Sequence, residues 1–134
     1  MDIDELYARA LEAASRSYSP YSRFRVGAAL LCVDGSVYTA ANIENRSFGL
    51  TTCAERNAVA AAVGAGRRDF EAIVVATPDA EYPVSPCGAC RQVLSEFLPP
   101  KAAVVFGSSA ADLVVTTMGQ LFPNDALHEL GDRH

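Results

Sequence analysis

Residues 53–106 read CAERNAVAAAVGAGRRDFEAIVVATPDAEYPVSPCGACRQVLSEFLPPKAAVVF, and they contain two successive helix–strand pairs. The alanine-rich run Cys53–Gly64 predicts a helix, and the β-branched run Ala72–Thr77 predicts a buried strand. Cys87–Leu98 predicts a second helix, which stops before two consecutive prolines, and Ala102–Phe106 predicts a second strand. Helices that alternate with strands are typical of a sheet covered by helices.

The flanking sequence extends this pattern at both ends. Ile3–Ser17 carries apolar side chains at helical spacing and predicts an amphipathic first helix. Arg25–Val33 and Ser36–Ala41 predict two strands, because the Asp34-Gly35 pair between them is a strong β-hairpin signal. Asp112–Thr116 predicts a last strand. The order of elements indicates an α/β fold with a mixed sheet and helices on its faces.

Length and composition favour one cytoplasmic domain. The 134 residues suffice for a single domain, residues 1–134, and a hydrophobic content of 50% excludes a disordered chain. No apolar run approaches the ~20 residues of a membrane-spanning helix. The sequence starts Met-Asp-Ile-Asp-Glu-Leu, without the basic and apolar segments of a signal peptide. We therefore expect a cytoplasmic location and no membrane partner.

The charge balance bears on the ligand. The net charge is −5, from 11 Lys and Arg against 16 Asp and Glu. Proteins that bind nucleic acids depend largely on a positively charged surface. We therefore expect no nucleic-acid partner and favour a small, roughly neutral ligand.

Three of the four cysteines stand at the starts of predicted helices. Cys53 begins one helix, and Cys87 and Cys90 begin another, where free amides and the helix dipole favour thiolates. In a reducing cytosol, metal binding or catalysis is a more common use of such cysteines than disulfide formation. Three thiolates around one cation suit Zn²⁺. Three protein ligands also leave the position for water that distinguishes a catalytic zinc site from a structural one.

No fourth protein ligand is expected. Cys32 lies within an apolar strand pattern and is predicted to be a small core residue. His128 and His134 lie among the last residues, where solvated side chains are common.

Glu55 stands two residues after Cys53, in the first turn of the same predicted helix. Its carboxylate there is placed to take a proton from a metal-bound water and to pass it to a leaving nitrogen. A second interpretation is that Glu55 only complements the positive end of the helix dipole. The downstream Pro-Cys-x-x-Cys favours the catalytic interpretation.

Two other interpretations of the cysteines are open. Cys87-Gly-Ala-Cys90 at a helix start also suits a redox pair of the thioredoxin kind, or half of a zinc knuckle. A redox pair gives no reason for Cys53 and Glu55, and a knuckle lacks its fourth ligand. Both are therefore less favoured than an open zinc site.

The sequence Cys53-Ala54-Glu55, followed by Pro86-Cys87-x-x-Cys90, resembles the signature of the zinc-dependent nucleoside deaminases. Within that class the chain is similar to the small cytidine deaminases. The resemblance also covers residues 20–29 (PYSRFRVGAA), 42–45 (NIEN) and 87–93 (CGACRQV). It therefore extends over nearly the whole chain.

The resemblance implies a role for each matching position. Cys53, Cys87 and Cys90 would bind one zinc per chain, and Glu55 would be the proton shuttle. By the same resemblance, Asn42 and Glu44 would bind the ribose, and Phe24 would be an aromatic wall of the pocket. The Ala54 N–H would donate to the 2-oxo group of the base. An Asx turn for the first pair and a core position for the aromatic are the alternatives.

Arg56 has a physical rationale beside this resemblance. Three thiolates give a zinc centre a net negative charge, which weakens the metal as a Lewis acid. A guanidinium that donates to a thiolate would offset this charge. The alternative is a surface arginine that faces away from the site.

The resemblance also implies the architecture: a three-layer α-β-α fold with a mixed five-stranded sheet, assembled as a homotetramer with sites at subunit contacts. The segment Phe48–Leu50 would lie near such a contact. The chain departs from the family at its C-terminus, where a phenylalanine usually reaches a neighbouring subunit's substrate. Leu127 stands near that point, without an aromatic ring.

The function implied is zinc-dependent hydrolytic deamination of cytidine and 2′-deoxycytidine, in pyrimidine salvage. The first alternative is deamination of a modified cytosine nucleoside such as blasticidin S. A second alternative is a zinc-stabilised binding module without turnover, against which Glu55 argues. Editing of a polynucleotide is disfavoured by the acidic charge.

Overall fold

The computed structural model describes residues 1–125, and these contain one five-stranded sheet in the order β2-β1-β3-β4-β5. The parallel pair is β3–β4, and the other neighbours are antiparallel, so the predicted mixed sheet is confirmed. The strands are β1 (Gly27–Cys32), β2 (Val37–Ala41), β3 (Phe70–Ala76), β4 (Ala103–Gly107) and β5 (Val114–Thr117).

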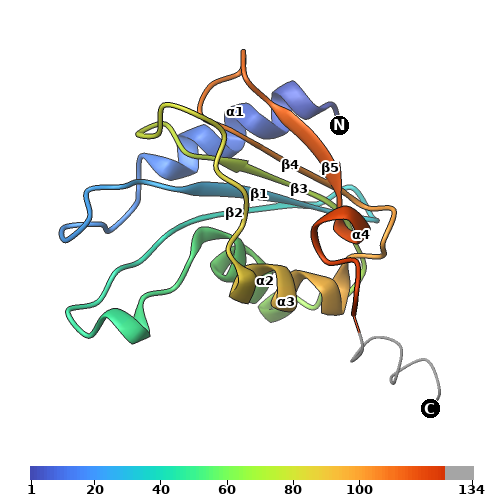
Figure 1. Ribbon diagram of the computed structural model, residues 1–134. Helices are drawn as coiled ribbons and strands as arrows, with labels where there is room; N and C mark the ends of the chain where they lie inside the picture. Colours follow the sequence, from blue (N-terminus) through green and yellow to red (C-terminus); the bar gives the residue numbers. More distant parts are fainter. Residues whose placement is uncertain (126–134) are drawn as a thin grey trace.

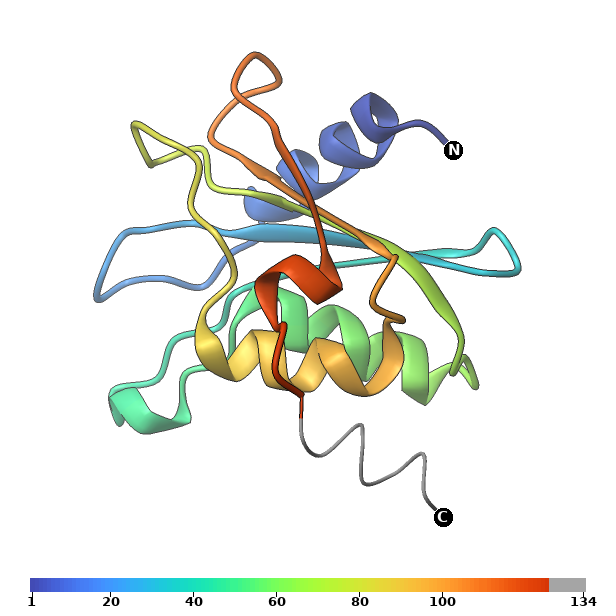
Figure 2. The same cartoon turned by 45° about the vertical axis from the view of Figure 1, so that its right-hand side comes forward.

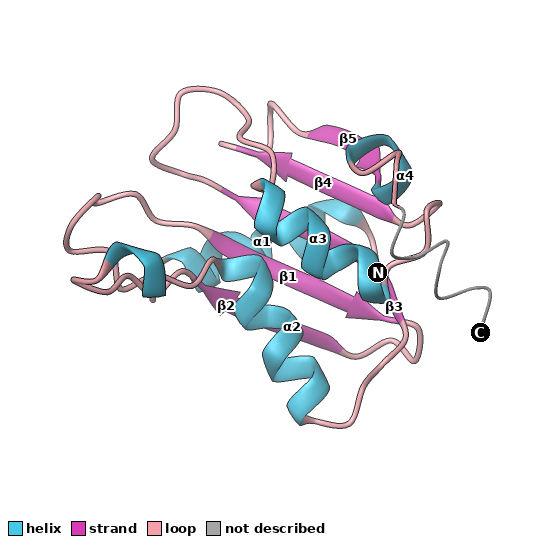
Figure 3. Ribbon diagram, turned by 60° about the horizontal axis from the view of Figure 1, so that its bottom comes forward, coloured by secondary structure: helices cyan, strands magenta, loops and turns pink. Residues whose placement is uncertain are grey.

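Helices cover both faces of this sheet, which confirms the three-layer α-β-α arrangement. Helix α1 (Ile3–Ala14) lies on one face, and α2 (Ala54–Gly64) and α3 (Gly88–Phe97) lie side by side on the other (Figures 1, 2 and 3). Two short helices complete the described chain: the 3-10 helix η1 (Phe48–Leu50) before α2, and α4 (Met118–Leu121) after β5. No helix within residues 1–125 is long and apolar enough to cross a membrane.

Strand β1 shows why the sheet needs two helical layers. All six of its residues are buried. Ala28, Leu30 and Cys32 contribute to the core beneath α2 and α3, and the alternate residues Ala29 and Leu31 contribute to the core beneath α1. The prediction that Cys32 is a core residue is confirmed.

Gly27, at the start of β1, permits a close contact with α1. A β-carbon at this position would lie 1.9 Å from the Ala10 carbonyl oxygen and 2.6 Å from the Ala14 nitrogen. Both atoms belong to backbone, so no side-chain rotation could make room. The end of α1 is thereby held against the point where the chain enters the sheet.

Some predicted boundaries were wrong. The first helix ends at Ala14 rather than Ser17, because the following segment bonds elsewhere: the Tyr18 N–H donates to the Asn42 carbonyl, and Tyr18 forms a bridge with Ile43. The first strand starts at Gly27, not Arg25. The last strand is Val114–Thr117 rather than Asp112–Thr116.

Candidate active site

The cysteine cluster lies where α2 and α3 begin. Cys53 is the N-cap of α2, and Cys87 is the N-cap of α3 and accepts a hydrogen bond from the Cys90 N–H. The Sγ atoms of Cys53 and Cys87 are 4.0 Å apart, and those of Cys87 and Cys90 are 3.4 Å apart. All three lie within 4.8 Å of one another, and they form the one such candidate metal cluster within residues 1–125.

These sulfur positions fit a zinc ion. With Zn–S bonds of ~2.3 Å, two thiolates at a tetrahedral angle lie about 3.8 Å apart. The Cys87–Cys90 and Cys53–Cys87 Sγ···Sγ distances, 3.4 and 4.0 Å, fall on either side of that value. The donor set of three thiolates also matches the preference of zinc for sulfur. Cys32, the fourth cysteine, is buried in the core and takes no part in the cluster.

Arg56 faces this cluster. Its Nη2 lies 3.4 Å from the Cys53 Sγ, and its buried Nε has no hydrogen-bond partner within residues 1–125. The pKa of the Cys53 thiol is lowered to about 5, first by a hydrogen bond from Cys90 and then, against the effect of burial, by the Arg56 guanidinium. The thiolate form that metal binding requires is therefore favoured at Cys53.

Glu55, the second residue of α2, is 4% exposed. Burial, with a smaller contribution from the charge of Cys53, raises the pKa of its carboxyl group to about 7. A carboxyl group with such a pKa exchanges protons readily near neutral pH, which suits a general acid and base.

Glu55, Cys53 and Cys87 line a cavity of about 420 Å³, a size typical of small-molecule sites. Of the predicted residues, Phe24, Asn42 and Glu44 also line it. Ala54 is the first residue of α2, and the N–H groups of a first helical turn have no acceptor within the helix. Lining residues that the sequence did not indicate are Ser22, Val26, Thr51, Val75, Thr77, Val84 and Ser85.

Asn42 is buried and forms most of its possible hydrogen bonds within the protein. Its Oδ1 accepts from the Val26 N–H at 3.0 Å and from the Ser17 hydroxyl, and its Nδ2 donates to the Phe24 carbonyl at 2.9 Å. Each partner is 16 or more positions away, so the side chain does not form the local Asx turn considered above. One Nδ2–H is left without an acceptor in residues 1–125.

Glu44 is bonded in a similar way. Its Oε1 accepts from the N–H groups of Tyr21, at 2.9 Å, and Ser22, at 3.1 Å, and its Oε2 accepts from the Ser22 hydroxyl. These hydrogen bonds lower the pKa of the Glu44 carboxyl group, and the bond from the Ser22 hydroxyl has the largest effect. Glu44 is therefore kept ionised. One acceptor position is left on Oε2. One free donor on Asn42 and one free acceptor position on Glu44 are the hydrogen-bonding groups that a single hydroxyl needs, since a hydroxyl accepts one hydrogen bond and donates another.

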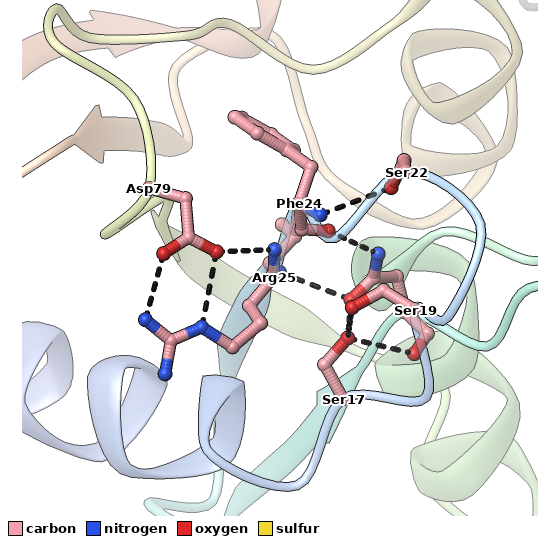
Figure 4. A network of polar contacts seen from close by, with 8 residues as sticks. Ser17, Ser19, Ser22, Phe24, Arg25 and Asp79 are labelled. Carbon is pink, nitrogen blue, oxygen red and sulfur yellow. Dashed lines mark hydrogen bonds and ion pairs between the residues drawn. The ribbon is translucent and has the colours of Figure 1, made fainter.

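An ion pair fixes the segment that carries Phe24. The Arg25 backbone N–H and Nε both donate to Asp79 Oδ2, at 2.8 and 3.0 Å, and Nη2 donates to Oδ1 at 2.7 Å (Figure 4). These hydrogen bonds lower the pKa of Asp79 to about 2, and those from the Arg25 guanidinium have the largest effect. The loop after β3 is thus tied to the loop before β1. No local pattern in the sequence indicates this contact, because its two residues are 54 positions apart.

Comparisons with known proteins show the family of the chain. Residues 1–107 match the family model of the cytidine and deoxycytidylate deaminase zinc-binding region. The chain belongs to the cytidine deaminase family. A cytidine deaminase of Halalkalibacterium halodurans is 50% identical over 123 residues, which cover 92% of each protein. The crystal structure of a cytidine deaminase from Burkholderia pseudomallei is similar with a TM-score of 0.88 at 44% identity, over 92% of this chain and 98% of the other.

The cytidine deaminase family predicted from the two cysteine motifs is thereby confirmed, and with it the enzyme class, a hydrolase. A blasticidin-S deaminase of Bacillus cereus is also similar, at 33% identity over 126 residues, or 89% of this chain and 88% of that protein. It is a more distant relative than the two cytidine deaminases described above, which are 50% and 44% identical. Leu127, His128 and His134 lie outside the described residues.

Proposed function

We propose that the protein deaminates cytidine and 2′-deoxycytidine with water, forming uridine or 2′-deoxyuridine and ammonia, as a step of pyrimidine salvage. The observation that carries this proposal is the cavity that Glu55 shares with Cys53 and Cys87 of the cysteine cluster. A buried carboxyl group with a raised pKa beside three candidate zinc ligands suits hydrolysis at a C–N bond.

We assign Cys53, Cys87 and Cys90 as the ligands of one zinc ion per chain. Bound zinc would supply a Lewis acid that lowers the pKa of water. Arg56 would offset the charge of the thiolates, because its guanidinium donates to the Cys53 sulfur.

Glu55 would transfer the protons. Its carboxylate takes a proton from the attacking water and gives it to N3 of the cytosine ring, while a C–O bond forms at C4. It then takes the proton of the new C4 hydroxyl group and passes it to the amino nitrogen, so that the C4–N bond breaks, ammonia leaves and C4 becomes the carbonyl carbon of uridine. A pKa close to 7 allows both transfers at neutral pH.

The other predicted residues would orient the nucleoside. The Ala54 N–H would donate to the 2-oxo group of the base, and Phe24 would line the space for base and sugar. The one donor position left on Asn42 and the one acceptor position left on Glu44 support recognition of one sugar hydroxyl.

A panel of nucleosides tests this function on protein of measured zinc content. Ammonia release is expected from cytidine and 2′-deoxycytidine at comparable rates. Because a buried site that bonds one hydroxyl rejects an analogue without it, 3′-deoxycytidine should then be used roughly 10²-fold or more less efficiently. Turnover of blasticidin S alone would instead assign the protein to the modified-nucleoside deaminases. Zinc-bound protein without turnover of any compound would favour a binding module.

We also propose a homotetramer with the cavity at a subunit contact. Phe48 and Leu50 in η1 are 75% and 69% exposed, and Phe48 packs edge-on against Tyr21, whose neighbour Ser22 lines the cavity. Exposed apolar side chains of this size are typical of an interface.

Light scattering after size-exclusion chromatography measures the assembly. The mass is expected at four times the 14.2 kDa of one chain, and Phe48→Asp is expected to shift it to smaller species. A wild-type mass of one chain would contradict the tetramer.

A further inference from the structure

Ser22 contacts both the sugar-binding and the base-binding side of the cavity. Its backbone N–H donates to Glu44 Oε1 at 3.1 Å, and its hydroxyl donates to Glu44 Oε2. The same hydroxyl accepts a hydrogen bond from the Phe24 N–H at 3.0 Å (Figure 4). One side chain thus joins the carboxylate assigned to the sugar and the backbone of the aromatic residue assigned to the base.

The residue between these two contacts has an uncommon backbone. Arg23 has a φ of +58°, the one positive φ at a non-glycine residue within residues 1–125. Such a conformation is unfavourable for an L-residue and is found where the surroundings enforce it. Here Ser22 is held on Glu44 and Phe24 is held on Asn42 Nδ2, so the intervening residue is constrained from both sides.

The contacts of Ser22 also fix the orientation of Glu44. A carboxylate bonded through Oε1 alone could rotate about its terminal bond. The Ser22 hydroxyl bonds Oε2, while the backbone N–H groups of Tyr21 and Ser22 bond Oε1. The two carboxylate oxygens therefore cannot exchange places by rotation. The one remaining acceptor position therefore keeps a constant direction on the cavity wall.

We propose that Ser22 is a positioning residue for sugar recognition: its hydroxyl orients the Glu44 carboxylate toward the nucleoside hydroxyl and holds the backbone turn that leads to Phe24. This inference rests on the proposed function, because the nucleoside is its ligand. Ser22 acts through Glu44: within residues 1–125 its hydroxyl bonds Glu44 and the Phe24 N–H and forms no hydrogen bond with Glu55.

Steady-state kinetics of Ser22→Ala test this role. The KM for cytidine should rise about tenfold, the effect of one hydrogen bond to a charged group, with kcat within about a factor of two. The penalty for 3′-deoxycytidine should shrink by a similar factor, because a misoriented Glu44 no longer distinguishes the two sugars. Ser22→Thr keeps a hydroxyl and should restore most of the wild-type KM.

Two further variants separate positioning from a general effect on structure. In a Glu44→Gln background, Ser22→Ala should add little to the KM, because the two residues act as a unit. Ser36→Ala is the matched control: its hydroxyl donates to the Asp34 carboxylate in the β1–β2 turn, at the other end of β1, and its loss should leave KM and kcat unchanged.

The outcomes distinguish this inference from the proposed function. A wild-type enzyme that deaminates cytidine, together with an unchanged KM in Ser22→Ala, would overturn the role of Ser22 alone. Equal losses for cytidine and 3′-deoxycytidine, or additive effects with Glu44→Gln, would do the same. A zinc-loaded wild-type protein that deaminates neither nucleoside would overturn both.

Discussion

Glu55→Gln is expected to lower kcat for cytidine by roughly 10³-fold, within the range that general acid–base catalysis contributes, while zinc content stays unchanged. Glutamine has nearly the same shape as glutamate but cannot accept and release a proton. The position is 4% exposed, and a neutral amide there avoids the cost of burying a charge. The melting temperature should therefore stay the same or rise.

Binding and control measurements complete this test. Cytidine should still bind to Glu55→Gln in equilibrium dialysis, because the cavity is otherwise intact. Glu71→Gln, at the exposed second position of β3, is the matched control and should keep full activity. A Glu55→Gln protein that retained zinc and turned over at the wild-type rate would remove Glu55 from the chemistry.

Loss of the metal is expected to have the second large effect. Removing zinc with a chelator should abolish ammonia release and lower the melting temperature, and added zinc should restore both. A ligand present at ~1,000 times its Kd stabilises the folded state by about 4 kcal/mol, which corresponds to roughly 10–15 °C for a chain of this size. The stabilisation arises because the unfolded chain does not bring the three thiolates together.

Substitution of a candidate ligand cysteine can be compared with substitution of the core cysteine. Cys87→Ser is expected to lower zinc affinity by more than the ~10–100-fold typical of residues that only support a ligand, with a parallel loss of activity. Cys32→Ala removes a sulfur from the apolar core, and it should cost some stability but leave zinc content and kcat unchanged. Zinc content measured by atomic absorption in both variants decides the ligand set. Full zinc content in Cys87→Ser would exclude Cys87 as a ligand.

Much of the fold could be predicted because its signals are local. Asp34-Gly35 indicates the hairpin, and the alternation of helices and strands indicates a covered sheet. The short helix α4 also has a local signal in the sequence, because Thr117 and Gln120 form a capping box. The early end of α1 has none, because it depends on bonds between Tyr18 and residues that follow β2.

The candidate site divides in the same way. The cysteines and Glu55 could be predicted from the sequence because helix starts have a known chemistry and a short spacing. Asn42 and Glu44 came from family resemblance alone, since nothing near them in the sequence shows that they face a cavity. Ser22 was part of the matching stretch, but its contacts with Glu44 span 22 positions and depend on the folded loop.

A single-turnover reaction of zinc-loaded protein with cytidine in ¹⁸O-labelled water measures the proposed chemistry most directly. Mass spectrometry should find uridine with one ¹⁸O atom, together with one ammonia per uridine, and both products should form roughly 10³-fold more slowly in Glu55→Gln. Cytidine recovered unchanged from zinc-loaded, folded wild-type protein, or uridine formed without ¹⁸O, would contradict hydrolytic deamination at this site.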